Sequence, residues 1–202
     1  MKLLLFIIIT LISSCSMKYG VLLGGQKEAH KEIARTFDNG GVQGIRVPDY
    51  NSNGSGYHFG LAEESNFFVT KMYYYHNSYA DKNYGAYKTS LAEKGFVTTL
   101  GLKLWILQPF IGFKTYNTIF TINGDSMKDT YSILTYGLDL EIPVTRNAHL
   151  YAGYSLNKKK EITYEEAVKV NLEKSHSELR FGLRWNFGAV KATTTTDSPS
   201  EK

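Results

Sequence analysis

The segment Glu178 to Phe187 alternates strictly between apolar and polar residues. Leucine, phenylalanine and tryptophan occupy every second position, and charged residues, Gly182 and Asn186 occupy the positions between them. Alternation with a period of two predicts a β-strand with two different faces. A large apolar face opposite a charged, glycine-containing face is typical of a strand in a membrane β-barrel.

Seven more segments alternate in the same way and predict seven more strands. They are Lys18 to Gly25, Tyr57 to Glu63, Phe67 to His76, Phe96 to Ile106, Gln108 to Phe120, Tyr131 to Ile142 and Ala148 to Leu156, and the last strand begins near Lys174. In the third segment both rows carry aromatic residues. Because Lys71 is charged, we assign its row, which includes Tyr73, to the interior. Phe68, Met72 and Tyr74 are then predicted to face outward.

The connections between these segments alternate between short and long. Tight turns are predicted at Glu64 to Asn66, Leu107 to Pro109 and Pro143 to Asn147. Longer connections are predicted at Gln26 to Gly56, with a charged and helix-like stretch from Lys27 to Arg35, and at Asn77 to Gly95, Thr121 to Thr130 and Asn157 to Glu173. Outer-membrane barrels place short turns in the periplasm. The chain is therefore predicted to be an all-β, eight-stranded antiparallel up-and-down transmembrane β-barrel with both ends periplasmic.

The polar rows combine glycines with charges of both signs, which favours a narrow interior over a solvent-facing surface. Glycine weakens the interior of a strand, so a solvent-facing row would have little use for it. In the fourth segment this polar row includes Trp105. Eight strands enclose only enough space for side chains, so we expect a non-conducting interior in which buried charges are paired. The predicted polar network contains Lys71, Lys103, Lys114, Asp139, Glu141, Glu178, Arg180 and Arg184.

Aromatic residues lie on or near the apolar rows and predict girdles at the membrane surfaces, where Trp and Tyr are favoured. The predicted girdle residues are Tyr19, Tyr57, Tyr74, Tyr136, Tyr154, Trp185 and Phe187. The alternative is that some of them are present only because aromatic residues suit strands.

The chain begins with a signal peptide pattern, in which Lys2 precedes an apolar run from Leu3 to Ile12 and then small residues. The run is shorter than the roughly 20 residues of a membrane-spanning helix. Ile12-Ser13-Ser14-Cys15 resembles the lipobox of bacterial lipoproteins, which implies that residues 1–14 are removed and that Cys15 is acylated. Ordinary cleavage nearby is the alternative. In enterobacterial lipoproteins a serine after the cysteine, like Ser16, favours transport to the outer membrane.

Composition limits the remaining function classes. The mature chain is long enough for one domain, and we assign residues 15–187 to the barrel and 188–202 to a disordered periplasmic tail rich in Thr, Ser and Lys. The formal net charge of the whole chain is +4, and its basic residues form no stripe of the kind that binds nucleic acid.

The chain resembles the small eight-stranded bacterial outer-membrane barrels of the OmpA and OmpX type. The similarity rests on Leu102 to Phe113, Tyr136 to Leu140 with Ala152 to Tyr154, and Phe181 to Phe187. It implies a monomer in the cell outer membrane, surrounded by lipid. It also implies that the aromatic end of the last strand, Phe187, is read by the barrel-assembly machinery, although here the chain continues beyond that residue.

Some barrels of this size are lipid A deacylases or palmitoyltransferases, so an enzyme is the first alternative. Catalysis would need a nucleophile and a base that converge. His76 with Ser78, and His176 between Ser175 and Ser177, do not converge automatically along a strand, and the deacylase His-x-Ser-Asn signature is absent. We therefore predict no enzyme, no catalytic residue, no cofactor and no metal site. The acidic cluster Glu161, Glu165 and Glu166 lies beside Lys158 to Lys160 and indicates a solvated hairpin tip.

The leading functional hypothesis is a structural or surface-interaction role carried by the extracellular loops, where ligand binding usually resides. Apolar residues from Ile162 to Val170 predict a β-ribbon that extends the last two strands, much as in OmpX-type proteins, and that could pair with a partner strand. The second alternative is a soluble, lipocalin-like lipoprotein whose apolar rows face an internal cavity for a small apolar ligand.

Overall fold

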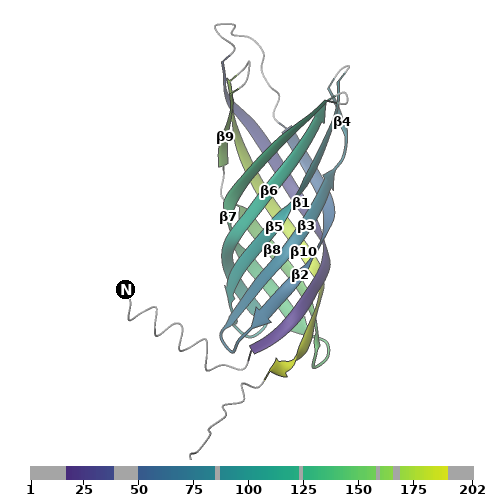
Figure 1. Ribbon diagram of the computed structural model, residues 1–202, viewed down its shortest axis with the longest axis vertical. Helices are drawn as coiled ribbons and strands as arrows, with labels where there is room; N and C mark the ends of the chain where they lie inside the picture. The colour runs from purple at the N-terminus through teal and green to yellow at the C-terminus, as the bar shows by residue number, and fades with distance from the viewer. Residues whose placement is uncertain are drawn as a thin grey trace, which may run out of the picture.

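The computed structural model describes residues 17–38, 50–84, 87–122, 125–157, 160–165 and 169–190. All of its named elements are β-strands (Figure 1). The predicted signal peptide, Cys15 and residues 191–202 of the predicted tail lie outside the described residues. The described part of the chain contains no helix that is long and apolar enough to cross a bilayer.

Eight long strands form the wall of a closed barrel (Figure 1). They are β1 (Met17–Asp38), β2 (Tyr50–Glu64), β3 (Phe68–Tyr79), β5 (Tyr87–Leu102), β6 (Leu107–Ile122), β7 (Asp125–Pro143), β8 (Ala148–Asn157) and β10 (Lys169–Val190). Neighbours in this order pair antiparallel, and β1 pairs with β10 from Met17↔Val190 to Asp38↔Lys169. The predicted eight-stranded antiparallel barrel is confirmed.

Two short strands extend the wall at one end. Strand β4 (Lys82–Tyr84) pairs with β5, and β9 (Lys160–Glu165) pairs with β10. The pairing of β9 with β10 forms the β-ribbon that the apolar residues of this region predict. The acidic residues of its tip have no described side chains, so the hairpin-tip prediction lies outside the described structure.

The two rows of each strand occupy opposite sides of the wall. Large apolar side chains cover the outer surface, where Leu23 is 64% and Phe113 63% exposed, whereas Leu22 next to Leu23 is buried. In β3, Lys71 and Tyr73 are buried and Met72 is exposed, as the position of Lys71 predicts. Such a continuous apolar outer surface is unfavourable in water and suits a lipid environment.

The turn between β5 and β6 differs from the prediction. The predicted fourth strand reaches Ile106, but β5 ends at Leu102, and Leu104 pairs with Leu107 across a two-residue turn. Trp105 lies in this turn with a φ of 61° and is 86% exposed, so its placement in the interior row is wrong. The error has a physical reason: positive φ is uncommon outside glycine, and no glycine or asparagine marks this turn.

The strands are longer than predicted at the end opposite the short turns. The helix-like stretch after Gln26 belongs to β1, which continues to Asp38, so that expectation is wrong. Likewise β6 reaches Ile122 and β7 begins at Asp125, within the predicted long connection. At the other end of the barrel, with the short turns, β10 continues to Val190, three residues beyond the predicted barrel end. Pairing between backbones continues into polar segments because the ladder of hydrogen bonds needs no apolar face.

Candidate functional site

The barrel interior is filled by charged and aromatic side chains. At the end with the short turns, Glu64 of β2 forms ion pairs with both Arg184 of β10 and Lys103, which follows β5. Arg184 also places its Nε atom 2.7 Å from Oε1 of Glu141 on β7. Three segments far apart in sequence therefore meet through one guanidinium group.

More ion pairs lie in the middle of the barrel interior, next to Glu141. Lys71 Nζ lies 2.8 Å from Asp139 Oδ2 and donates a hydrogen bond of 3.0 Å to Oε1 of Gln108. Gln108 in turn donates to Glu141 at 2.8 Å. Arg180 of β10 contacts Asp139 from the other side at 2.9 Å. The side-chain amide of Gln108 therefore links Lys71 to the carboxylate of Glu141.

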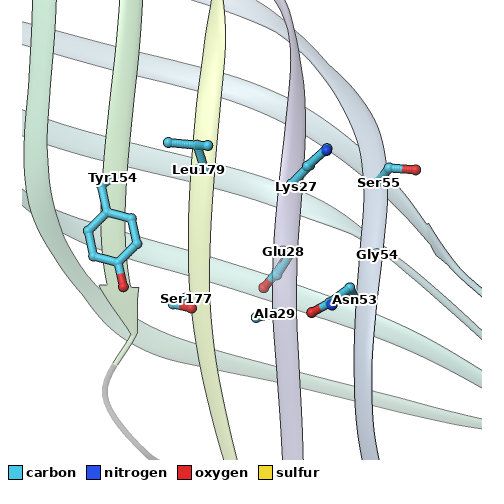
Figure 2. A pocket seen from close by; sticks show the side chains of 9 residues that line it. All are labelled: Lys27, Glu28, Ala29, Asn53, Gly54, Ser55, Tyr154, Ser177 and Leu179. Atoms are coloured by element: carbon cyan, nitrogen blue, oxygen red, sulfur yellow. The ribbon is translucent and has the colours of Figure 1, made fainter.

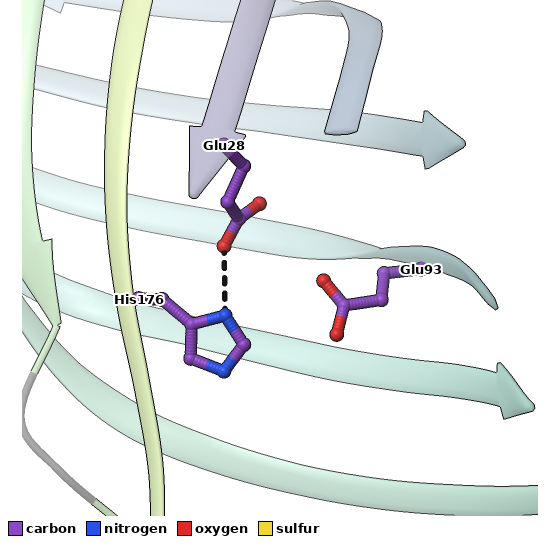
Figure 3. A group of neighbouring side chains, drawn as sticks. All are labelled: Glu28, Glu93 and His176. Atoms are coloured by element: carbon purple, nitrogen blue, oxygen red, sulfur yellow. Dashed lines mark ion pairs between the residues drawn. The ribbon is translucent and has the colours of Figure 1, made fainter. Parts of the chain in front are cut away.

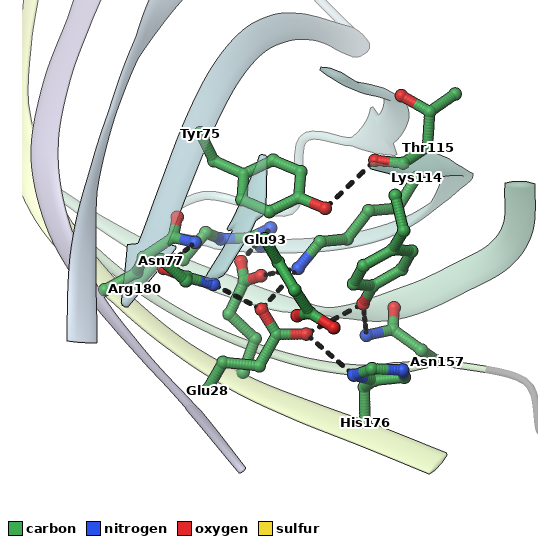
Figure 4. A network of polar contacts seen from close by, with 12 residues as sticks. Glu28, Tyr75, Asn77, Glu93, Lys114, Thr115, Asn157, His176 and Arg180 are labelled. Carbon is green, nitrogen blue, oxygen red and sulfur yellow. Dashed lines mark hydrogen bonds and ion pairs between the residues drawn. The ribbon is translucent and has the colours of Figure 1, made fainter. Parts of the chain in front are cut away.

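The chain of charges then reaches Lys114 (Figure 4). Arg180 lies 3.3 Å from Glu178, and Glu178 forms an ion pair with Lys114. Lys114 Nζ lies 2.9 Å from Glu28 and 4.2 Å from the centre of the Tyr75 ring, a cation–π contact. Each charge between Glu64 and Glu28 therefore has at least one opposite charge within 4.0 Å. We call this set the interior ion-pair network: Glu28, Glu64, Lys71, Lys114, Asp139, Glu141, Glu178, Arg180 and Arg184.

Two carboxylates and an imidazole gather beyond Lys114, at the end of the barrel opposite the short turns (Figure 3). Glu28 of β1 lies 3.2 Å from Nδ1 of His176 on β10, and Glu93 of β5 lies beside them. Tyr131 contacts Nε2 of His176 at 3.1 Å. All three members of this Glu28-Glu93-His176 cluster are buried.

The predicted network residues divide into two groups. Seven of them are buried members of the interior ion-pair network, namely Lys71, Lys114, Asp139, Glu141, Glu178, Arg180 and Arg184. Lys103 differs, because its side chain is 33% exposed and contacts Glu64 instead of the three predicted carboxylates.

Sequence reasoning missed several interior residues. Glu28 continues the inward row of β1 that contains Gln26, but it lies beyond the predicted end of that strand. Glu64 lies one residue past the predicted end of the second strand, and Glu93 lies in a predicted connection. His176 lies in the predicted last strand on the same face as Glu178, as expected, but it is not among the predicted network residues. Extending each period-two row past the last apolar residue would have found Glu28 and Glu64.

The predicted girdle residues all lie on the outer side of the wall. Tyr74 is half-buried, because its ring packs against Phe59 and Phe96 at centroid distances of 5.4 and 5.5 Å. The other six are exposed: Tyr19, Tyr57, Tyr136, Tyr154, Trp185 and Phe187. This placement leaves their aromatic surface available to surrounding lipid.

The side chain of Ser175 lies outside the described structure, and the other candidate catalytic residues do not form a triad. His76 and Ser78 lie on the outer face of β3 with His76 Nε2 and Ser78 Oγ 3.5 Å apart. His176 points into the interior, whereas Ser177 points outward, so the wall separates these two side chains.

A shallow hollow of about 420 Å³ lies on the outer surface over β1, β2, β8 and β10 (Figure 2). It exists because small side chains of the outward rows, Ala29, Ser55 and Ser177, lie beside the larger Tyr154 and Leu179. The hollow contains no histidine or cysteine.

The fold resembles solved outer-membrane proteins. The outer membrane protein OprG from Pseudomonas aeruginosa aligns with a TM-score of 0.60 at 10% identity, over 87% of this chain and 98% of OprG. Ail, the attachment invasion locus protein of Yersinia pestis, gives 0.53 at 14% identity, over 85% and 99% of the two chains. Neisserial surface protein A gives 0.51 at 16%, over 83% and 97%.

No protein-family model and no curated protein sequence matches the chain. At the identities above, the structural likeness establishes the fold alone. That fold is the one found in small bacterial outer-membrane β-barrels, as the resemblance of the strand patterns predicts.

Proposed function

We propose that this protein is a monomeric β-barrel of the outer membrane that acts at the cell surface through its extracellular end and does not conduct. The observation that carries this proposal is the contrast between the two sides of the wall. Apolar side chains such as Leu23, Phe113 and Leu183 cover the outside, and paired charges fill the inside. A lipid-bounded barrel with a sealed interior would use both surfaces in this way, which supports the proposal.

The sealed interior supports a structural or binding role over transport. An ion that crosses the barrel would have to displace buried pairs such as Lys71 with Asp139 and Lys114 with Glu178. Removing one partner of a buried pair typically costs about 3 to 5 kcal/mol, and the barrel contains several in succession. Passage is therefore blocked by the ion-pair network itself.

The proposed orientation rests on the strand ends. Met17 and Val190 pair at the end with the short turns, and we place this end in the periplasm. The opposite end, with the extended β1 and β10 and the β9 ribbon, then projects outside the cell and offers strand edges and loops to an extracellular partner. The names of Ail and Neisserial surface protein A, an attachment protein and a surface protein, agree with such a role.

The two alternatives have less support. A lipid A-modifying enzyme would need a nucleophile, a base and a group that orients the base. His76 and Ser78 lie together on the outer face, but the contacts described for His76 are with Ser78 and the Tyr57 ring and include no carboxylate. His176 is inside the barrel, away from Ser177. A lipocalin-like carrier would need its apolar rows inside, whereas Leu23 and Phe113 are outside. Acylation of Cys15, girdles formed by residues such as Trp185, and recognition of Phe187 by the assembly machinery remain parts of the same proposal.

Four measurements test the proposal. The purified protein should require detergent, change its gel mobility on heating, and give no stepwise conductance in planar lipid bilayers. A protein that is soluble without detergent, or one that forms stable ohmic channels, would contradict the membrane assignment or the sealed interior respectively. Lipid A mass spectra of cells with and without the protein should be identical, because no modifying activity is proposed.

A further inference from the structure

Glu28, Glu93 and His176 bring two carboxylate oxygens and an imidazole nitrogen within 4.8 Å of one another inside the barrel (Figure 3). They are 1%, 0% and 4% exposed and come from three separate strands, β1, β5 and β10. We propose that this Glu28-Glu93-His176 cluster is a binding site for a divalent first-row transition metal ion, for which zinc is the probe. The site is independent of the surface role proposed above.

The ligand set and the spacing both suit such an ion. Zinc binds carboxylate oxygen and histidine nitrogen at about 2.0 to 2.2 Å, so atoms that share one ion lie within about 4.4 Å of one another. The three ligand atoms here are within 4.8 Å, and a shift of a few tenths of an ångström would bring them to that spacing. The site offers two oxygens and one imidazole nitrogen but no thiolate, so it does not favour soft metal ions.

Neighbouring hydroxyl groups already hold the three ligands in place. Tyr131 contacts Nε2 of His176 at 3.1 Å, so the other nitrogen, Nδ1, faces the carboxylates. Tyr116 stacks on the His176 ring with centroids 4.5 Å apart and donates to Glu28 at 2.8 Å. Tyr79 donates to Glu93 at 2.6 Å. Such outer contacts orient metal ligands and fix the histidine tautomer.

A lysine already lies beside one of the three ligands, because Lys114 Nζ is 2.9 Å from Glu28. A bound metal ion would share Glu28 with Lys114 and add positive charge where Glu28 and Glu93 meet. The competing state without metal is a protonated His176 paired with Glu28.

The test uses the full chain, without a histidine tag, refolded into detergent micelles in the presence of zinc so that access to the interior does not limit binding. After gel filtration, metal analysis should find one zinc ion per chain. X-ray absorption at the zinc edge should show nitrogen and oxygen ligands and no sulfur, which separates this site from Cys15.

Variants identify the ligands. His176→Gln and Glu93→Gln should each lose bound zinc, and Tyr131→Phe should weaken zinc affinity about 10- to 100-fold through the orientation of His176. His149→Gln is the matched control, because His149 also contacts an interior carboxylate, Glu141 at 3.4 Å, but lies outside the cluster. It should keep its zinc. The absorption measurement on the unaltered protein holds even if a variant fails to fold.

The proposal is overturned if the unaltered protein retains no zinc, if sulfur appears among the ligands, or if His176→Gln and Glu93→Gln retain as much zinc as His149→Gln. The first of these results would favour the protonated His176 and Glu28 pair. None of them would affect the detergent and conductance tests of the proposed function.

Discussion

Arg180 and Asp139 form an ion pair of 2.9 Å across a strand that lies between them. Gly153 of β8 pairs in register with Asp139 on one side and with Arg180 on the other. A Cβ atom at this position would lie 1.9 Å from Oδ1 of Asp139 and 3.1 Å from Nη2 of Arg180. The missing side chain therefore makes the space in which the two charges meet.

Replacing Gly153 should break this pair. We expect Gly153→Val to lower the free energy of unfolding by about 3 to 5 kcal/mol, because the new side chain displaces Asp139 and leaves buried charges without partners. Urea unfolding of the refolded barrel, followed by tryptophan fluorescence, measures the change. Ala152→Val is the control, since Ala152 is adjacent but faces outward. Equal effects of both variants would mean that the position of Gly153 has no special role.

The pair itself can be measured by a double-mutant cycle. Asp139→Leu and Arg180→Met should each destabilise the barrel by about 3 to 5 kcal/mol, since each leaves a buried charge unpaired. The double variant should lose less than the sum, because neither charge then remains, and contacting residues are expected to couple. Strictly additive losses in the same urea assay would show that the two side chains act independently.

Arginine on the outer surface tests the lipid boundary. Leu23→Arg should cost about 2 to 4 kcal/mol in lipid vesicles if Leu23 faces the bilayer interior, whereas Tyr19→Arg, four residues nearer the strand start, should cost about 0 to 1 kcal/mol. Unfolding titrations in vesicles compare the two. If both substitutions cost the same small amount, the outer apolar surface is not embedded in a membrane.

The left-handed backbone conformation of Trp105 leads to a local prediction. Trp105 has a φ of 61°, a conformation that costs an ordinary L-residue roughly 1 to 2 kcal/mol. Trp105→Gly should therefore raise the free energy of unfolding in detergent by about 1 kcal/mol. The adjacent Ile106→Gly gives no such gain, since Ile106 has no positive φ. A loss of stability in Trp105→Gly would show that the exposed indole contributes more than the backbone conformation costs.

Much of the fold could be read from single strands. Leu179, Phe181 and Leu183 alternate with Arg180 and Gly182, and the period of two alone determined that one row faces away from the other. The same reasoning predicted the inward row of β3 correctly, because the charged Lys71 lies in that row. It failed where no side-chain pattern marks the change, at the Trp105 turn and in the polar upper part of β1.

The sequence by itself therefore determined the strands, their two faces and most of the interior charges, because these depend on residues that are neighbours along the chain. Only the tertiary structure decided which charges meet. Lys114 and Glu28 are 86 residues apart, and Glu28, Glu93 and His176 come from three strands. Their meeting depends on how the barrel closes, since the pairing register of β1 with β10 sets which rows face one another across the interior.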